Sequence, residues 1–147
     1  MKINYPAVIV AAIIHFMIGG LWYGLLFGNL FLRIIAWTPA QIEQVKANSS
    51  PVQYLVALAT SFVLCYILAH FVQYTKAKGV ADGMQTGFWL WLGFVATTQL
   101  PTVIFEQRPL GLYLLNVGYQ LTACLICGAL LAAWKPRTAS DPVAETA

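Results

Sequence analysis

The chain has 147 residues, of which 60% are hydrophobic and only 9% are charged, whereas a soluble domain carries roughly a quarter charged residues. A water-soluble fold of this size could not bury so much apolar surface. The net charge of +3 includes no basic patch interleaved with aromatic residues, which argues against a nucleic-acid-binding surface. The composition therefore indicates an integral membrane protein.

The charged residues bracket long charge-free runs, each longer than the roughly 20 residues that a spanning helix needs. These runs cover residues 3–32, 47–75, 83–105 and 109–134. Helix start and stop signals trim them to four predicted spans: Pro6–Phe27, Pro51–Tyr74, Ala81–Ile104 and Leu110–Trp134. Ser50 before Pro51, for example, is typical of an N-cap followed by a proline at the first helical position. The predicted fold class is all-α, an integral membrane four-helix bundle in a single domain, residues 1–135.

The first run raises the question of a secretory signal. Its apolar stretch exceeds the usual limit of about 15 residues, and no A-x-A-like cleavage site follows it. We therefore expect it to remain as a spanning helix.

The segments between the spans also carry signals. A T-P-x-Q pattern, formed by Thr38, Pro39 and Gln41, predicts a short helix through about Lys46 that lies on the outer face of the membrane. A loop with one helical turn is the alternative. The loop Phe105–Pro109 is so short that the third and fourth spans must form an antiparallel hairpin. The polar tail, residues 136–147, is expected to be disordered.

Basic residues predict the orientation of the chain in the membrane. Four spans place both termini and the second loop on one face, which holds Lys2, Lys76, Lys78, Lys135 and Arg137, against Arg33, Lys46 and Arg108 on the other. Cytoplasmic loops carry an excess of Lys and Arg. Both termini are therefore expected in the cytoplasm.

Glycines recur at helical spacing in two of the spans. The third span opens with Gly79, Gly83 and Gly87, and the first contains Gly20, Gly24 and Gly28. Such small-residue faces let another helix approach closely. The approaching helix belongs either to the same chain or to a partner, as a homo-oligomer or a larger membrane complex.

Polar residues within hydrocarbon cost free energy unless they find partners, so they are the candidate functional positions. His15, Ser61 and Gln120 fall at similar depth near the bilayer centre, and Asn116 and Gln99 lie further out, toward a pair formed by Glu106 and Arg108. These residues predict a polar seam. The seam is either a small-molecule or proton pathway that opens outward, or a set of hydrogen bonds that hold the helices together.

Other chemistries are disfavoured by what the spans contain. The first predicted span contains no acidic residue, which argues against a proton-driven exporter with a carboxylate in its first helix. Cys124 and Cys127 form a C-x-x-C, as in quinone-coupled thiol oxidoreductases, but the second, exposed cysteine pair of those enzymes is missing. We interpret them, with Cys65, as buried packing residues. No metal site and no cofactor are expected.

Several segments together resemble the bacterial domain of unknown function family 1761: Asn4, Ala7–Ala12, Gly20–Tyr23, Leu26–Gly28, Gly93–Phe94, Phe105–Pro109, Gly118–Tyr119, Gly128 and Trp134. The resemblance implies a compact four-span protein of the bacterial cytoplasmic membrane with no established activity. Trp22, Tyr23, Glu106, Arg108 and Tyr119 fall on the family pattern, which adds Tyr119 to the candidate seam, whereas His15 and the C-x-x-C do not. Asn116 and Val117 stand where the family carries an acidic residue.

Two functions remain open at this point. The first is a non-enzymatic membrane protein, either transporter-like or an accessory subunit of a larger complex. The second is a lipid- or quinone-linked membrane enzyme that uses Glu106 or His15 as an acid or base. In both cases the lipid bilayer is the expected surrounding and nucleic acid is not a partner.

Overall fold

The computed structural model describes residues 3–134, and every regular element in this range is helical. Four helices are long and apolar enough to cross a membrane, Tyr5–Leu26, Pro51–Tyr74, Val80–Phe105 and Leu110–Ala133. Their ends lie within one residue of the predicted span ends. The all-α class is confirmed, because long charge-free apolar runs can satisfy their backbone groups in hydrocarbon only as helices. The predicted tail, residues 136–147, lies outside the described residues.

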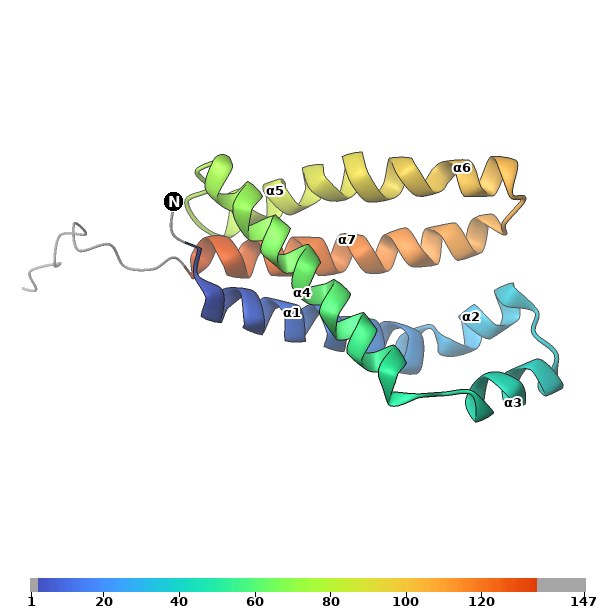
Figure 1. The fold of residues 1–147 in the computed structure, drawn as a ribbon. Coiled ribbons are helices and arrows are strands. Elements are labelled where there is room, and N and C mark those ends of the chain that lie inside the picture. The colour runs from blue at the N-terminus through green and yellow to red at the C-terminus, as the bar shows by residue number, and fades with distance from the viewer. Residues whose placement is uncertain (1–2, 135–147) are drawn as a thin grey trace, which may run out of the picture.

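The elements follow one another as α1 (Tyr5–Gly20), the π-helical segment η1 (Leu21–Leu26), α2 (Gly28–Ile35), α3 (Pro39–Ala47), α4 (Pro51–Tyr74), α5 (Val80–Trp91), the π-helical segment η2 (Leu92–Ala96), α6 (Thr97–Phe105) and α7 (Leu110–Ala133). In Figure 1, α7 lies between α1 and the α5–α6 helix, and α4 crosses obliquely. The N-terminus, the α4–α5 loop and the end of α7 share one end of the molecule, while α2, α3 and the α6–α7 turn lie at the other. Helix α7 contacts α1, α4, α5 and α6.

The buried core joins α1, α4 and α7 through small and medium-sized side chains. It contains Ala7, Val8, Ala11, Ala12, Cys65, Leu68, Ala69, Val72, Ala77, Cys127, Leu131 and Ala132. The alanines bring the three backbones close together, as small residues do between membrane helices. The three cysteines are free and buried, and the Cys127 thiol donates to the Ala11 carbonyl over 3.4 Å.

Helix α5 packs directly on the backbone of α7 through glycines. A Cβ atom built at Gly83 would overlap the carbonyl oxygen of Gly128, and one at Gly87 would overlap the carbonyl oxygen of Cys124. The G-x-x-x-G pair in the third span therefore meets a helix of the same chain. Gly79 does not take part in this contact, because it precedes α5 with a φ of 134° and serves the turn.

The glycines of the first span have different surroundings. A Cβ at Gly20 or Gly24 would meet no atom within 4 Å, so this face of the first span touches no other described helix. Gly28 lies against its own chain, where a Cβ would approach the Tyr23 carbonyl oxygen to 2.7 Å. The two glycine patterns look alike in sequence, but of their members only Gly83 and Gly87 pack against another spanning helix of the described chain.

The α2–α3 segment connects the first two spans. The predicted capping box at Thr38 is present, since the Gln41 N–H donates to Thr38 Oγ1 over 3.3 Å and the Thr38 N–H donates to Gln41 Oε1 over 2.8 Å. A full helix follows, which rules out the alternative of a single helical turn. Helix α2, which the sequence did not predict, ends where Ala36 adopts a left-handed φ of 54°.

We predict that Gly87→Ala destabilises the fold by about 1–3 kcal/mol, because the new methyl group must displace the backbone of α7. Gly20→Ala is the matched control, since it adds the same methyl to open space and should change stability by no more than the roughly 0.5–1 kcal/mol that helix propensity contributes. Thermal unfolding of both variants in the same detergent measures the difference. Equal midpoints would contradict the packing described for α5 and α7.

Candidate functional site

A buried histidine lies where α1, α4 and α7 meet. Only 4% of His15 and 4% of Ser61 is exposed. The His15 Nδ1 lies 2.9 Å from Ser61 Oγ on α4, and Nε2 lies 3.4 Å from Gln120 Oε1 on α7. Three polar residues that share a depth in three separate spans therefore come together, because a polar side chain in hydrocarbon is stable only beside another.

Tyr119 completes this group from α7. Its hydroxyl lies 3.3 Å from His15 Nδ1 and 3.4 Å from the His15 carbonyl oxygen, and the two rings meet edge to face with centroids 5.5 Å apart. Gly19 leaves room for the hydroxyl, since a Cβ there would lie 3.1 Å from it. We call His15, Ser61, Tyr119 and Gln120 the histidine cluster.

The hydrogens of the histidine cluster can be arranged in two complete ways. With a neutral imidazole, Nε2–H donates to Gln120 and Nδ1 accepts from the Ser61 or Tyr119 hydroxyl. With a protonated imidazole, Nδ1–H donates to Ser61, whose own proton goes to the Ala57 carbonyl oxygen 2.8 Å away, while Tyr119 donates to the His15 carbonyl. Apart from the added proton on Nδ1, the two arrangements differ only by rotation of hydroxyl groups, so every group keeps a partner in either state.

Two aromatic residues join α1 to α7 further along the first span. The Tyr23 hydroxyl donates to Asn116 Oδ1 over 2.6 Å, and the Trp22 indole N–H donates to the Leu115 carbonyl over 3.1 Å. Both residues lie in the π-helical segment η1. Both donors are therefore turned onto α7. The Tyr23 and Tyr119 rings are 5.6 Å apart, which links this pair to the histidine cluster.

The remaining seam residues lie apart from the histidine cluster. Gln99 is half-buried on α6, and among residues 3–134 no hydrogen bond joins its side chain to the cluster. Glu106 and Arg108 form an ion pair of 2.7 Å in the α6–α7 turn, with both side chains more than half exposed. The predicted seam thus consists of a buried inner part on α1, α4 and α7 and a separate, solvent-exposed pair.

The cysteines show no sign of a metal centre in the described part of the chain. Within residues 3–134, no three His, Cys, Asp or Glu side chains gather as metal ligands would. Cys65 and Cys127 belong to the α1–α4–α7 core, while Cys124 is buried beside α5, where its carbonyl faces Gly87. Their surroundings are those of small packing residues.

Comparison with known proteins now adds one result. Residues 6–132 match the family described as protein of unknown function (DUF1761). The chain belongs to this family. The match covers all four spans and the histidine cluster, and it confirms the resemblance seen in the sequence motifs. No curated protein and no solved structure matches the chain. The protein is thus a multi-pass membrane protein of a family whose description assigns no activity.

We predict that Ser61→Ala lowers stability by about 0.6 kcal/mol and by no more than about 1.7 kcal/mol, the average and the maximum measured for hydrogen bonds between membrane helices. Thr60→Ala is the control, because Thr60 also donates to the Ala57 carbonyl, over 2.9 Å, but is exposed. Unfolding of both variants in bicelles gives the comparison. If Ser61→Ala cost no more than Thr60→Ala, the contact with His15 would contribute nothing to folding.

Proposed function

We propose that this protein is a non-enzymatic accessory subunit that packs against another protein within the bacterial cytoplasmic membrane. The observation that supports this proposal is the open face of the first span. Gly20 and Gly24 are exposed and meet nothing within 4 Å, while the equivalent glycines of α5 are covered by α7. In lipid, exposed small residues offer a neighbouring helix a close backbone approach, which is the main source of helix association there.

The surroundings of the candidate acid and base favour this role over an enzymatic one. A general base must reach the proton that it removes. The His15 ring is almost fully buried, and both of its nitrogens already have partners in the protein. Glu106 is exposed at the turn but is held by Arg108. The alternative of a lipid- or quinone-linked enzyme would require the histidine cluster to open toward the bilayer.

The same closure argues against the transporter-like variant. A pathway across the membrane needs polar groups that face a water-filled space. In the histidine cluster the polar groups instead face one another, at distances of 2.9–3.4 Å. We therefore favour an accessory role, in which the cluster keeps the helices in register and the outer face of the first span receives the partner.

We also propose that the end of the molecule with the α4–α5 loop faces the cytoplasm. Lys76 and Lys78 lie in this loop, whereas Arg33, Lys46 and Arg108 lie toward the opposite end (Figure 1). Lys2, Lys135 and Arg137, which also enter the argument, lie outside the described residues. Counted with these three, which adjoin the start of α1 and the end of α7 in the sequence, the loop side has five basic residues against three, as the positive-inside rule requires of a cytoplasmic side.

Labelling of added cysteines tests this orientation. Ser49→Cys and Lys78→Cys introduce exposed thiols at opposite ends, while the three native cysteines are buried. A membrane-impermeant maleimide applied to intact spheroplasts should label Ser49→Cys at once and Lys78→Cys only after lysis. Wild-type protein, which should stay unlabelled, is the control, and the reverse pattern would contradict the proposal.

The accessory role predicts that bulky side chains on the open face abolish association. Gly20→Leu with Gly24→Leu should reduce co-purification and in-cell crosslinking of the partner severalfold, because leucine side chains separate the two helix backbones. Gly93→Leu is the matched control, since Gly93 is also exposed with nothing within 4 Å but lies in the third span. Association that survives in the double variant would refute this use of the face, and a homodimer as the only species would identify the partner as a second copy.

A further inference from the structure

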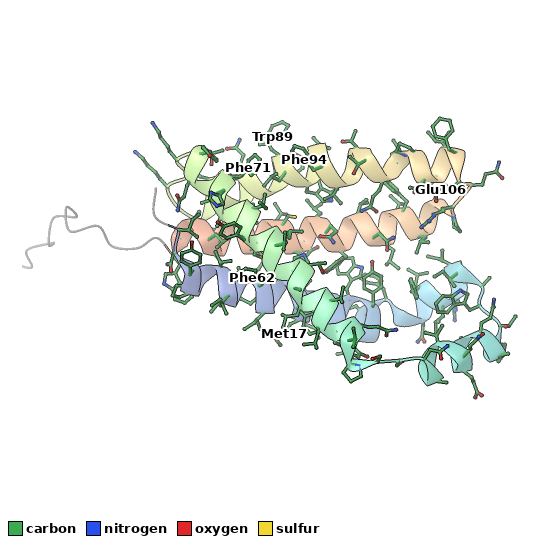
Figure 2. The ribbon with its side chains drawn as sticks, viewed as in Figure 1. Met17, Phe62, Phe71, Trp89, Phe94 and Glu106 are labelled. Carbon is green, nitrogen blue, oxygen red and sulfur yellow. The ribbon has the colours of Figure 1, made fainter. Side chains whose placement is uncertain are left out.

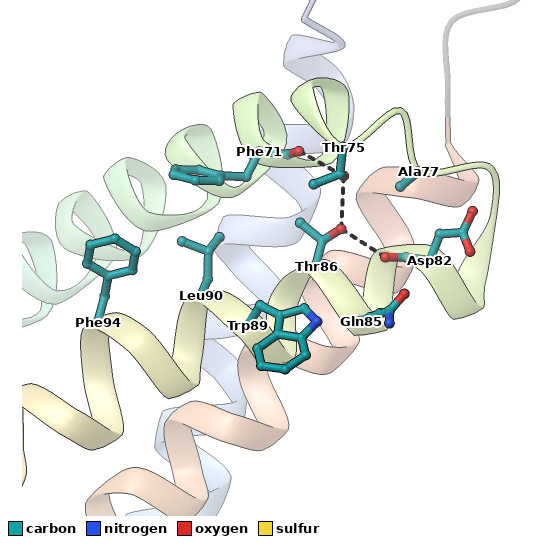
Figure 3. Close-up of a pocket in the computed structure, with 9 residues that line it drawn as sticks. All are labelled: Phe71, Thr75, Ala77, Asp82, Gln85, Thr86, Trp89, Leu90 and Phe94. Atoms are coloured by element: carbon teal, nitrogen blue, oxygen red, sulfur yellow. Dashed lines mark hydrogen bonds between the residues drawn. The ribbon is translucent and has the colours of Figure 1, made fainter.

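A continuous groove runs between α4 and α5. It consists of a hollow of about 500 Å³ near the α4–α5 loop and a second of about 340 Å³ deeper along the spans. The two share Phe71, Leu90 and Phe94 as lining residues, so one leads into the other. Figure 3 shows the end near the loop, and Figure 2 shows Phe71, Trp89 and Phe94 gathered on this side of the molecule. Both volumes fall in the usual range for small-molecule sites.

The end near the loop is polar. Thr75 and Thr86 share a hydrogen bond of 3.0 Å, and Thr86 donates to the Asp82 carbonyl over 2.9 Å, so these hydroxyls are already satisfied (Figure 3). The Asp82 carboxylate accepts the Lys78 backbone N–H through Oδ2 over 2.7 Å. Its other oxygen and the exposed Gln85 amide are left for a ligand in this hollow.

Within residues 3–134, charge at this end comes from three side chains. The exposed residues Lys76 and Lys78 flank Ala77, which lines the hollow beside Asp82. Among residues 3–134 the Glu106–Arg108 pair is the salt bridge formed, so neither lysine ammonium is held by a carboxylate. Asp82 lines the hollow and the two lysines belong to the loop that borders it, so the charges at this end suit a headgroup that carries both a phosphate and an ammonium group.

The deeper end is apolar. It is lined by Leu64, Ile67, Leu68, Phe71, Leu90, Trp91, Phe94, Val95 and Cys124. The 12 residues from Asp82 to Phe94 correspond to about 18 Å of helix at 1.5 Å per residue. Half of the roughly 30 Å hydrocarbon core of a bilayer is about 15 Å. The groove as a whole, from its polar end to its apolar end, is therefore about as long as one leaflet is thick.

We propose that this groove binds one phospholipid with an ethanolamine headgroup. One acyl chain lies along Ile67, Leu90 and Phe94, the phosphate lies near Lys76 and Lys78, and the ammonium group pairs with Asp82. The site is separate from the α1 face of the proposed function and goes beyond it.

The lining argues against two other occupants. A protein helix needs small residues to approach, but the lip of this groove is formed by large side chains, with Trp89 60% and Phe94 67% exposed. A quinone has an apolar tail but no charge, so it would leave the Asp82 carboxylate and both ammonium groups without a counterpart. A phospholipid fills the apolar length and meets all three charges.

Competition between lipids in nanodiscs tests whether the apolar end of the groove holds an acyl chain. Protein purified from mixed phosphatidylethanolamine, phosphatidylglycerol and phosphatidylcholine is analysed by native mass spectrometry for retained lipid. Ile67→Trp fills the groove from its wall and should reduce retention of one lipid severalfold. Val56→Trp, on an equally exposed part of α4 away from both hollows, should retain lipid as the wild type does. Equal retention in the two variants would overturn the proposal.

The headgroup is tested independently through Asp82. Asp82→Asn keeps an acceptor for the Lys78 N–H but removes the charge, so the preference for ethanolamine over glycerol headgroups should fall about two- to fivefold, as for an exposed ion pair. Glu106→Gln removes a carboxylate at the opposite end and should leave the preference unchanged. A wild-type preference for phosphatidylglycerol, or an unchanged preference in Asp82→Asn, would overturn the headgroup assignment.

Discussion

The direct backbone contact between α5 and α7 is the constraint from which much of this structure follows. At Gly83, Gly87 and Gly128 the two helices approach until no side chain fits between them. Apolar side chains gain little by leaving lipid for one another, so such close packing is what makes membrane helices associate. The contact also determines the position of α5 relative to α4, because α5 is drawn onto α7 while α4 crosses obliquely (Figure 1). The groove lies between α4 and α5.

A second constraint is that polar side chains in hydrocarbon need partners. His15 meets it with Ser61 on α4 and with two residues of α7, so one histidine connects three of the four spans. The arrangement satisfies the imidazole whether it is neutral or protonated, because the neighbouring hydroxyls can turn. A cluster built in this way holds helices in register and has no need of a substrate. This favours a role for the protein as a partner over a role as a catalyst.

The two open faces of the molecule differ in a way that indicates different neighbours. Beside Gly20 and Gly24 the backbone itself is accessible, which suits a second helix. Between α4 and α5 the lip is made of large aromatic rings and the mouth carries charge, which suits a lipid. An accessory subunit would bind its partner through the Gly20 and Gly24 face, while a lipid from the bilayer fills the groove between α4 and α5. The two faces share no residues, so both can be used at once.

The sequence by itself determined the four spans, because charges are too costly in hydrocarbon to lie deep inside them and local signals such as Ser50–Pro51 and Thr38–Gln41 determine where helices begin. It also indicated that His15, Ser61 and Gln120 would meet, since they share a depth. Depth does not reveal rotation about the helix axis, however. Each π-helical segment holds one extra residue and turns the following side chains by about 100°. Gln99 follows η2 and stands apart from the histidine cluster, which periodicity could not predict, whereas Trp22 and Tyr23, seven and eight residues after His15, share its helix face by periodicity alone. Only the tertiary structure decided which glycine face another helix covers and whether α4 and α5 enclose a groove, because both depend on how the helices cross.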